Sequence, residues 1–477
     1  MPFDSTEDFL RACIEAGEAV EITKEVDWDL EAGAIVRRVC ETRAPAPFFT
    51  NIRDYPGHRM AGATCASFKR MAIALDLDPD TPVQEIADEF GKRRMKHIKP
   101  VMIEDAPVQE NVIMGDDVDL SQFPAPMIHD GDGGRFLSTW HFVVTRDEAT
   151  DWTNWGMYRQ MVHNEKCMGT LALPHGDLGK MIAKKELTGE KIPAATVIGP
   201  DPLCAATGCT PAGVNVSEVD LAGGLRQKPV ELVKCKTLDL EVPAHAEIII
   251  EGHIIPNVRV DEGPLGEYTG FRTSPRGPRP VFEVECITHR NNPIVTMSNM
   301  GIPTADGNII VSGLANPSIV KKLLRDVGIP VTGVYSPPEG CGFILVVAAR
   351  KPYNNIAVQI GNAIHAHPMF QGYNSQVIVV DETVDPSNWG EVIHAMAMKL
   401  HPLKGITQYP SSGAPLSPFL SVEERKQMRG GKVIYDCTWP VEWDERTEKP
   451  DRMSFKECYT KETQQLVLDN WKSYGYE

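Results

Sequence analysis

Apolar residues recur at helical spacing in the first stretch of the chain. Phe9, Leu10 and Ile14, for example, fall on one helical face. The pattern predicts a helix that starts at Ser5, a strand at 19–23, a helix at 30–42, a strand at 48–52, and helices at 68–77 and 83–96. Because helices and strands alternate, we expect a small α/β lobe over residues 1–110.

Shorter apolar runs replace the helical spacing over residues 111–312. They predict one clear helix at 178–187 and strands at 142–145, 194–198, 231–233, 247–255 and 281–288. Turn signals rich in glycine and proline, such as 130–134 and 273–278, separate these runs. Many short strands with few helices favour a barrel or a sandwich in this part of the chain.

Helical and strand spacings alternate again over residues 313–477. They predict helices at 317–327, 355–365, 389–400 and 462–471, and strands at 343–349 and 376–380. Leu466, Val467 and Trp471 in the last helix could cover a neighbouring subunit or the helix's own domain. The whole pattern predicts a multidomain protein of the α+β or α/β class.

Composition and charge narrow the function further. The 477 residues are too many for one core. Acidic residues outnumber basic ones by 65 to 48, and the resulting charge of -17 disfavours binding to nucleic acid or to an anionic membrane. No apolar run approaches the ~20 residues of a membrane span. The acidic N-terminus lacks a signal-peptide pattern, and the eleven scattered cysteines fit a reducing compartment, so we expect a cytoplasmic protein.

Several common catalytic motifs are absent from the sequence. It contains no phosphate-binding G-x-x-x-x-G-K-[ST], no dinucleotide G-x-G-x-x-G after a strand, no H-E-x-x-H and no G-x-S-x-G. Nucleotide hydrolysis, hydride transfer by a bound dinucleotide, zinc protease chemistry and α/β-hydrolase chemistry are therefore disfavoured.

Two carboxylates, Glu262 and Glu267, flank a short segment that contains Pro264 and two glycines. Proline and glycine there rule out a regular helix or a central strand, so the segment must turn tightly. Such a turn can bring both acids to one rim, where different surroundings can make one an acid and the other a base. The alternative is a polar hairpin turn that faces solvent.

Three further residues have the chemistry of a metal site. Asn154, His175 and Glu218 offer an amide oxygen, an imidazole nitrogen and a carboxylate, which together suit Mg²⁺ or Mn²⁺ when a phosphate completes the shell. His175 also precedes the predicted helix at 178–187, and a helix N-terminus attracts anions. Each residue alone has a more ordinary use, as a turn former, a structural histidine or a solvated acid.

Taken together and in this order, these segments resemble the UbiD-type decarboxylases, which use prenylated flavin mononucleotide (FMN). The resemblance is carried by 154–159, by Pro174 with His175, by Glu218 and by the E-G-P-x-G-E motif at 262–267. It extends from the N-terminal helix to about residue 402. It implies a split β-barrel that binds the flavin, between the N-terminal α/β lobe and a C-terminal α/β oligomerisation domain with a helical tail.

The resemblance also implies a cofactor site and its ligands. A divalent metal, Mn²⁺ or Mg²⁺, would be held by Asn154, His175 and Glu218 and would bridge to the flavin phosphate, with K⁺ nearby. The residues implied in cofactor binding are Asn154, Trp155, Gly156, Met157, Tyr158, Arg159, Pro174, His175 and Glu218. One position departs from the family pattern: many relatives have a lysine that helps hold the phosphate where this chain has Gln376.

Catalysis in the family rests on an arginine and two glutamates, here Arg159, Glu262 and Glu267. Arg159 cannot lose its proton, so it can hold Glu262 ionised or orient a substrate carboxylate. Glu267 is the expected proton donor, and burial should raise its pKa. We expect 297–304 and Asp306 to face the substrate.

The predicted function is the reversible, non-oxidative decarboxylation of an aromatic or heteroaromatic acid, similar to a hydroxybenzoate, with release of CO₂. The alternatives are an aryl-CoA substrate, an α,β-unsaturated acid, or a flavin-binding subunit without activity of its own. A flavin prenyltransferase would supply the cofactor, and a homodimer or homohexamer is expected. We expect His365 and His367 to be helix-end residues rather than substrate contacts.

Overall fold

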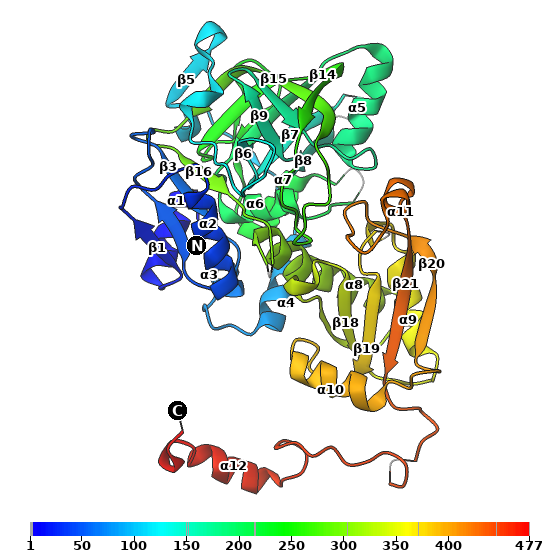
Figure 1. Cartoon of the computed structure of the whole chain (residues 1–477). Coiled ribbons are helices and arrows are strands. Elements are labelled where there is room, and N and C mark those ends of the chain that lie inside the picture. The colour runs from blue at the N-terminus through cyan, green and yellow to red at the C-terminus, as the bar shows by residue number, and fades with distance from the viewer. Residues whose placement is uncertain are drawn as a thin grey trace.

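A computed structural model of the chain describes residues 3–148, 150, 152–213, 216–302, 304–370, 372–444 and 446–476. In Figure 1 the chain runs from an N-terminal lobe in blue, through a strand-rich central part in cyan and green, to a C-terminal part in yellow and orange. This order of α/β, strand-rich and α/β segments confirms the predicted multidomain class.

Helices and strands alternate in the N-terminal lobe, as the apolar spacing predicts. Its elements are α1 (Thr6–Glu15), β1 (Ala19–Ile22), α2 (Glu31–Thr42), β2 (Ala46–Phe49), β3 (Arg59–Gly62), α3 (Phe68–Ala74) and α4 (Val83–Arg94). The sheet has the order β1-β2-β3-β16. Its last strand, β16 (Ile294–Met297), pairs in parallel with β3 and comes from far along the chain. The lobe is therefore joined to the central part within one sheet.

The central part is built on one large sheet. Its strands are β5 (Asn111–Met114), β6 (Phe136–Ser138), β7 (His141–Asp147), β8 (Trp152–Gly156), β9 (Gln160–Asn164), β10 (Cys167–Thr170), β11 (Ile192–Ile198), β14 (Ile248–Glu262) and β15 (Gly277–His289). The order is β6-β9-β10-β15-β14-β11-β7-β8, with β5 beside β15. Among the described residues the end strands β6 and β8 are not paired with each other, so the sheet is not a closed barrel. A small second sheet joins β4 (Val101–Met102), β12 (Glu231–Lys234) and β13 (Glu241–Pro243).

The central part also contains α5 (Asp177–Thr188), α6 (Pro202–Cys209) and α7 (Glu218–Arg226). The sequence pattern predicts α5 and misses the other two, so the expectation of a single helix here is wrong, although strands still predominate. Both missed helices are buried along nearly their whole length and therefore lack the polar face that marks an amphipathic helix. In addition, α7 contains Gly223 and Gly224, which lower its helix propensity.

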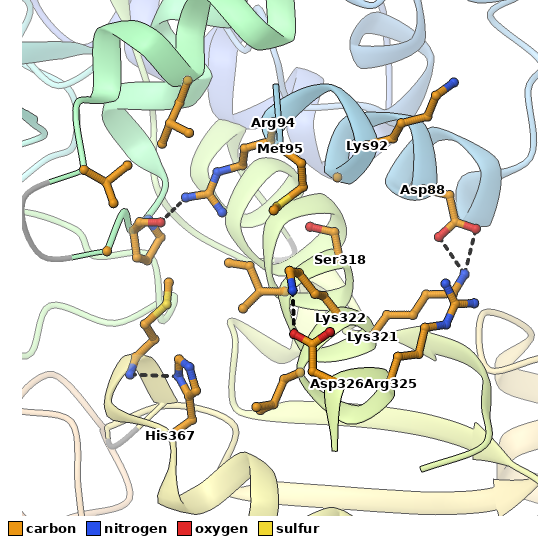
Figure 2. Close-up of a pocket in the computed structure, with 18 of the residues that line it drawn as sticks. Asp88, Lys92, Arg94, Met95, Ser318, Lys321, Lys322, Arg325, Asp326 and His367 are labelled. Atoms are coloured by element: carbon orange, nitrogen blue, oxygen red, sulfur yellow. Dashed lines mark hydrogen bonds and ion pairs between the residues drawn. The ribbon is translucent and has the colours of Figure 1, made fainter. Parts of the chain in front are cut away.

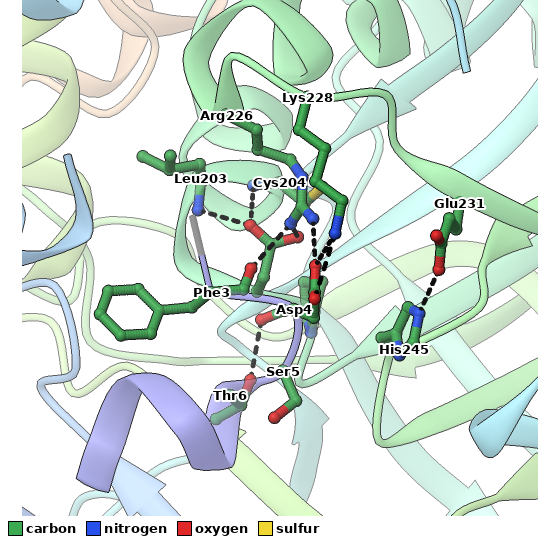
Figure 3. Close-up of polar contacts among 12 residues, drawn as sticks. Phe3, Asp4, Ser5, Thr6, Leu203, Cys204, Arg226, Lys228, Glu231 and His245 are labelled. Atoms are coloured by element: carbon green, nitrogen blue, oxygen red, sulfur yellow. Dashed lines mark hydrogen bonds and ion pairs between the residues drawn. The ribbon is translucent and has the colours of Figure 1, made fainter. Parts of the chain in front are cut away.

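Buried ion pairs join α6, α7 and the N-terminal segment (Figure 3). Arg226, the last residue of α7, lies 2.7 Å from Asp201, the residue that caps α6. The same guanidinium donates to the Phe3 carbonyl and to the Asp4 carboxylate, each at 2.9 Å. Arg226 and Asp201 are both buried, and this network fixes the position of α7. The helix begins at Glu218, one of the predicted site residues.

A second α/β unit follows, after a π-helical segment at Asn308–Ala315. Its elements are α8 (Asn316–Asp326), β17 (Val331–Tyr335), β18 (Ile344–Ala349), α9 (Ile356–Ala366), β19 (Gln376–Asp381), α10 (Trp389–Lys399), β20 (Ile406–Ser412), α11 (Val422–Gln427) and β21 (Arg429–Cys437). The sheet order is β17-β18-β19-β21-β20. The sequence pattern misses the β20–β21 hairpin, because Pro410 in the edge strand and two glycines in β21 are atypical of strands.

The C-terminal tail leaves this unit and ends in α12 (Lys461–Asp469), drawn in red in Figure 1. The tail confirms the predicted loops and terminal helix. None of the helices in the described part of the chain combines the length and the apolar character that a membrane span needs.

Candidate active site

Glu262 and Glu267 lie at the two ends of a tight loop that follows the longest strand. Glu262 is the last residue of β14, and Gly263 then adopts a φ of +81°, which favours glycine. The backbone N–H of Gly133 donates to the Pro264 carbonyl at 2.8 Å and holds the loop against the 130–134 turn. Glu262 is 0% exposed and Glu267 is 7% exposed. The alternative of a solvent-facing hairpin turn is therefore wrong.

Arg159 lies between these two carboxylates. It follows β8 in the loop that leads to β9, and its guanidinium forms a bidentate pair with Glu262, with Nε–Oε1 at 2.8 Å and Nη2–Oε2 at 3.1 Å. Its Nη1 donates to Oε1 of Glu267. A second cation, Arg279, has its Nε 3.9 Å from Glu262. One permanent cation thus contacts both buried acids, and a second lies beside Glu262.

The two acids differ in their surroundings. Burial raises the pKa of Glu267 to about 7, because the attraction of Arg159 offsets only part of the burial and the charge of Glu262 acts in the same direction as burial. Burial alone would lower the pKa of Arg159, but the charges of Glu267 and Glu262 outweigh it and raise that pKa. Glu267 can therefore bind or release a proton near neutral pH, while Glu262 is held by the fork of Arg159.

A cavity of about 270 Å³ opens beside Arg159 and Glu267. Its walls are largely aromatic, aliphatic and thioether groups, with a few polar ones. They include Met157, Tyr158, Leu173, Leu265, Tyr268, Met300, Tyr373 and Leu416. Such walls can accept a flat ring, and the polar groups at one side can orient it. Tyr373 and Leu416 come from the C-terminal unit, so the cavity lies where two parts of the chain meet.

The segment predicted to face the substrate does so only in part. Ser298 and Met300 line the cavity. Asp306 does not, because it is buried behind Ser298 and accepts from the Ser298 hydroxyl at 2.9 Å and from the Cys65 N–H at 2.7 Å. Burial raises the pKa of Asp306. Pro303 lies outside the described residues.

His129 also lines the cavity, and sequence reasoning did not find it. Its Nδ1 lies 2.8 Å from Asp132 Oδ2 and its Nε2 lies 2.7 Å from Asn299 Oδ1. The Asn299 amide donates its own N–H to the Gly33 carbonyl at 2.8 Å, so its oxygen is the group that faces His129. Both histidine nitrogens therefore face side-chain oxygens, which fixes the orientation of the ring at the cavity wall. The available signal was a His and an Asp three residues apart, at the edge of the 130–134 turn.

The predicted metal ligands gather around the segment 154–158. Asn154 is buried in β8 and its Nδ2 donates to the Tyr158 hydroxyl at 3.4 Å. Glu218 is buried at the start of α7, and its Oε2 accepts from the Trp155 N–H at 3.4 Å. His175 is exposed in the turn before α5 and lines the same cavity as Tyr158. The structure thus brings Asn154 and Glu218 to one segment and places His175 at its cavity wall.

The titration of these groups reflects their burial. Burial raises the pKa of Glu218 to about 7, and burial together with the charge of Lys180 lowers the pKa of His175. Within the described ranges, no group of three or more His, Cys, Asp and Glu side chains is arranged to hold a metal ion. Asn154 is not one of those residue types, so the predicted set contributes only His175 and Glu218 to such a group.

The other residues predicted to bind cofactor occupy varied positions. Trp155 is buried and stacks on Phe142 with ring centroids 4.4 Å apart, so its backbone rather than its side chain faces Glu218. A Cβ at Gly156 would lie 2.6 Å from the Tyr158 ring, which explains the glycine there. Pro174 is exposed beside His175.

The C-terminal positions singled out from the sequence lie away from the cavity. Gln376 lines a separate cleft with Lys432 and Tyr409. His365 lies in the last turn of α9 and contacts the Tyr409 hydroxyl at 2.6 Å, as expected for a helix-end residue. His367 directly follows that helix and accepts from the Met369 N–H at 3.3 Å.

Comparison with known proteins gives matches along nearly the whole chain. The models of the N-terminal, Rift-related and C-terminal domains of 3-octaprenyl-4-hydroxybenzoate carboxy-lyase (UbiD) match residues 10–90, 99–303 and 311–437. The chain is 30% identical to pyrrole-2-carboxylic acid decarboxylase of Pseudomonas aeruginosa, over 96% of each protein. It is 28% identical to ferulic acid decarboxylase 1 of Saccharomyces cerevisiae, over 98% of each.

Solved structures give the same result. Vanillic acid decarboxylase of Sedimentibacter hydroxybenzoicus, in an open form, superposes with a TM-score of 0.88 at 27% identity, covering 99% of this chain and 100% of that one. A UbiD-class enzyme from Pelotomaculum thermopropionicum in complex with FMN superposes with a TM-score of 0.84 at 26% identity, covering 98% and 100%.

Proposed function

Because the chain belongs to the UbiD family of carboxy-lyases, we propose that it decarboxylates an aromatic or heteroaromatic acid without net oxidation, with Glu267 as the proton donor. The buried contact of Arg159 with Glu262 and Glu267, beside a cavity with largely apolar walls, carries the proposal. It provides one fixed ion pair and one carboxyl group that exchanges its proton near neutral pH.

The residues divide the work by charge. Prenylated FMN, when bound, supplies the electron-accepting centre for the electron pair released as the C–C bond to CO₂ breaks. Arg159 holds Glu262 in place through a bidentate contact, and its positive charge can orient the substrate carboxylate. Glu267 then gives its proton to the ring carbon that has lost CO₂. It regains a proton from solvent, so atoms and charge balance over the cycle.

We propose that Asn154, His175 and Glu218 hold a divalent ion, Mn²⁺ or Mg²⁺, at the flavin phosphate, with K⁺ nearby. The donor set supports this, because carboxylate and amide oxygens with an imidazole nitrogen suit such ions. A second observation is that the Glu218 carboxylate is buried, with a long hydrogen bond from the Trp155 N–H at 3.4 Å and another from its own backbone N–H. A bound cation would offset the cost of burying its charge.

We also propose how the protein is supplied and assembled. A flavin prenyltransferase would provide the cofactor, and the cytoplasm would be its location. The C-terminal α/β unit and tail would form a homodimer or homohexamer. The tail supports this, because its apolar side chains remain exposed in a single chain. We retain residues 110 and 312 as the approximate limits of the central domain.

The lining of the cavity bears on the choice of substrate. Among the described residues no lysine lines it, and its arginine is already engaged by two carboxylates. A CoA ester, whose phosphates need cations, is therefore less well supported than a small free acid. An unsaturated acid is the second candidate, because a relative of nearly the same length is a ferulic acid decarboxylase.

A panel of acids tests the proposal. The protein would be produced together with a flavin prenyltransferase and incubated with vanillate, pyrrole-2-carboxylate, ferulate and an aryl-CoA. CO₂ release and exchange of the ring hydrogen in D₂O would be followed. We expect turnover of at least one free acid, and loss of turnover in Glu267→Gln. If cofactor-loaded protein is silent on the whole panel, the proposal is wrong; if Glu267→Gln matches the wild type, Glu267 is not the proton donor.

A further inference from the structure

A cleft of about 660 Å³ lies between α4 and α8 and is distinct from the catalytic cavity (Figure 2). Basic side chains from both helices line it, namely Lys92, Arg94, Lys321, Lys322 and Arg325. Among the described residues that line it, the acids are Asp88 and Asp326. In a chain whose net charge is -17, this local excess of positive charge favours an anionic ligand.

Several of these cations already have carboxylate partners, whereas Arg94 has none in the part of the chain that the structure describes. Lys321 lies 2.6 and 2.7 Å from the two oxygens of Asp88, and Lys322 pairs with Asp326. Arg94 donates one N–H to the Pro211 carbonyl. Its Nε is buried and has no hydrogen-bond partner among the described residues. A guanidinium with an unused buried donor costs free energy until a ligand satisfies it.

Arg94 is held close to the helix that carries Glu218. The chain just after α4 contacts α7 directly, because the Ile98 N–H donates to the Asp220 carbonyl at 3.1 Å. A Cβ at Gly224 would lie 1.7 Å from the Lys96 carbonyl oxygen, so only glycine permits this approach. Leu221 of α7 lines the same cleft as Arg94, so the guanidinium lies beside the helix that begins at Glu218.

Neither Gln376 nor Lys432 can take the phosphate in its place. Gln376, which stands where relatives carry a lysine, lines a different cleft. In that cleft the Lys432 ammonium donates to the Phe370 carbonyl at 3.0 Å and to the Tyr373 carbonyl at 2.7 Å. Burial lowers the pKa of Lys432 to about 8, and its donors are already directed at these two carbonyls.

We propose that Arg94 supplies the cation that binds the phosphate of the flavin cofactor, at the end of the cofactor nearest Glu218. The inference rests on the proposed function, because it assigns a residue to the same cofactor. Arg94 would contribute charge-assisted hydrogen bonds from its guanidinium, which lies beside α7.

Comparing FMN with riboflavin isolates the phosphate, since the two share a ring system and differ by that group. The protein, produced without a flavin prenyltransferase, would be titrated with each flavin in the presence of Mn²⁺ while flavin fluorescence is followed. We expect the wild type to bind FMN more tightly than riboflavin. Arg94→Ala should weaken the binding of FMN about ten- to hundred-fold and leave the affinity for riboflavin unchanged. Arg94→Lys should recover part of the lost affinity for FMN, because lysine keeps the positive charge but lacks the planar guanidinium that can donate two parallel hydrogen bonds.

Lys321→Ala is the matched control, because Lys321 lines the same cleft and is already paired with Asp88. It should leave the affinity for FMN within about two-fold of the wild type, as expected for a side chain that does not contact the ligand. If folded Arg94→Ala keeps the wild-type preference for FMN over riboflavin, the inference is overturned while the proposed function stands. If the wild type binds neither flavin, the proposed cofactor itself is wrong. Should Arg94→Ala not fold, Arg94→Gln gives the same comparison with a side chain of similar length.

Discussion

At the scale of single residues, the position of Arg159 has consequences for stability as well as chemistry. Removing it leaves Glu267 buried without this cation, while Glu262 keeps the more distant Arg279 at 3.9 Å. We expect Arg159→Ala to lower the free energy of unfolding by about 3–5 kcal/mol at pH 8. The loss should be smaller at pH 6, where Glu267, whose pKa burial raises to about 7, is mostly neutral. Urea unfolding of the wild type and the variant at both pH values measures this difference in the free energy of unfolding.

Arg11 provides a matched control for this prediction. It also contacts two carboxylates, Glu7 at 3.3 Å and Glu21 at 2.6 Å, but on an exposed face of α1. Solvent screens such pairs, so Arg11→Ala should cost no more than about 1 kcal/mol. Equal losses in the two variants would show that the burial of the Arg159 cluster does not matter for stability.

Glu267 should set the pH dependence of decarboxylation. The reaction requires its protonated form, and burial raises the pKa of Glu267 to about 7. The group therefore holds its proton below that pKa and loses it above, so kcat should fall with a single-proton slope as pH rises through about 7. In Glu267→Gln this limb should vanish and kcat should drop about 10²- to 10⁴-fold. Glu283→Gln, an exposed acid on β15, should retain the wild-type profile. A wild-type rate that rises through pH 7 would exclude the role.

At the scale of elements, the spacing of apolar residues predicts those helices whose formation depends mainly on local interactions. The amphipathic helices α2, α4 and α8 fall within a few residues of their predicted limits. The helices α6 and α7 are buried on nearly all sides, so their sequences lack the alternation of apolar and polar residues that identifies an amphipathic helix. Gly223 and Gly224 even argue against a helix, although they let the chain after α4 approach α7 closely. These two helices depend on tertiary contacts, so local sequence patterns could not predict them.

The same limit explains which site residues the sequence predicted. Arg159, Glu262 and Glu267 were predicted from motifs whose order is specific to a family. His129, Tyr373 and Leu416 come from separate loops, and their shared cavity exists only after the central and C-terminal parts meet. A local sequence pattern cannot predict that residues far apart in the chain will line one cavity. Gln376 shows the converse, because a family pattern pointed to a position that this structure directs into another cleft.

The contact between the 130–134 turn and the 262–267 loop is an element-scale constraint on catalysis. A Cβ at Gly133 would lie 1.8 Å from the Gly263 carbonyl oxygen, so any side chain must displace the loop. We expect Gly133→Ala to lower kcat about 10²-fold or more, because small misplacements of reacting groups cost that much. Binding of FMN, titrated separately, should change little. Gly277→Ala is the control: Gly277 pairs with Glu262 across β14 and β15, and a Cβ there would meet nothing within 4 Å. Equal activities in the two variants would mean that the loop tolerates the shift.

At the scale of the whole molecule, the C-terminal tail is the part that a single chain does not explain. In Figure 1 it extends away from the rest of the molecule, and α12 lies at its end. Leu466, Leu468 and Trp471 are 58%, 57% and 41% exposed. An isolated helix of this length is marginal in water, so it needs a surface to pack against. A second copy of the chain is the partner that the proposed homo-oligomer provides.

Substitutions in α12 test this assembly. Leu466→Glu with Leu468→Glu should shift the protein toward monomer, because two charges would have to be buried in the interface. Size-exclusion chromatography with light scattering, over a range of protein concentrations, measures the shift. Lys461→Gln with Gln465→Glu changes the net charge of the same helix by the same amount on exposed positions, and should leave the assembly intact. If the leucine variant keeps the wild-type mass at every concentration, the tail does not hold the oligomer together. The exposed apolar groups would then need another partner, and the β17-β18-β19-β21-β20 unit alone would carry the interface.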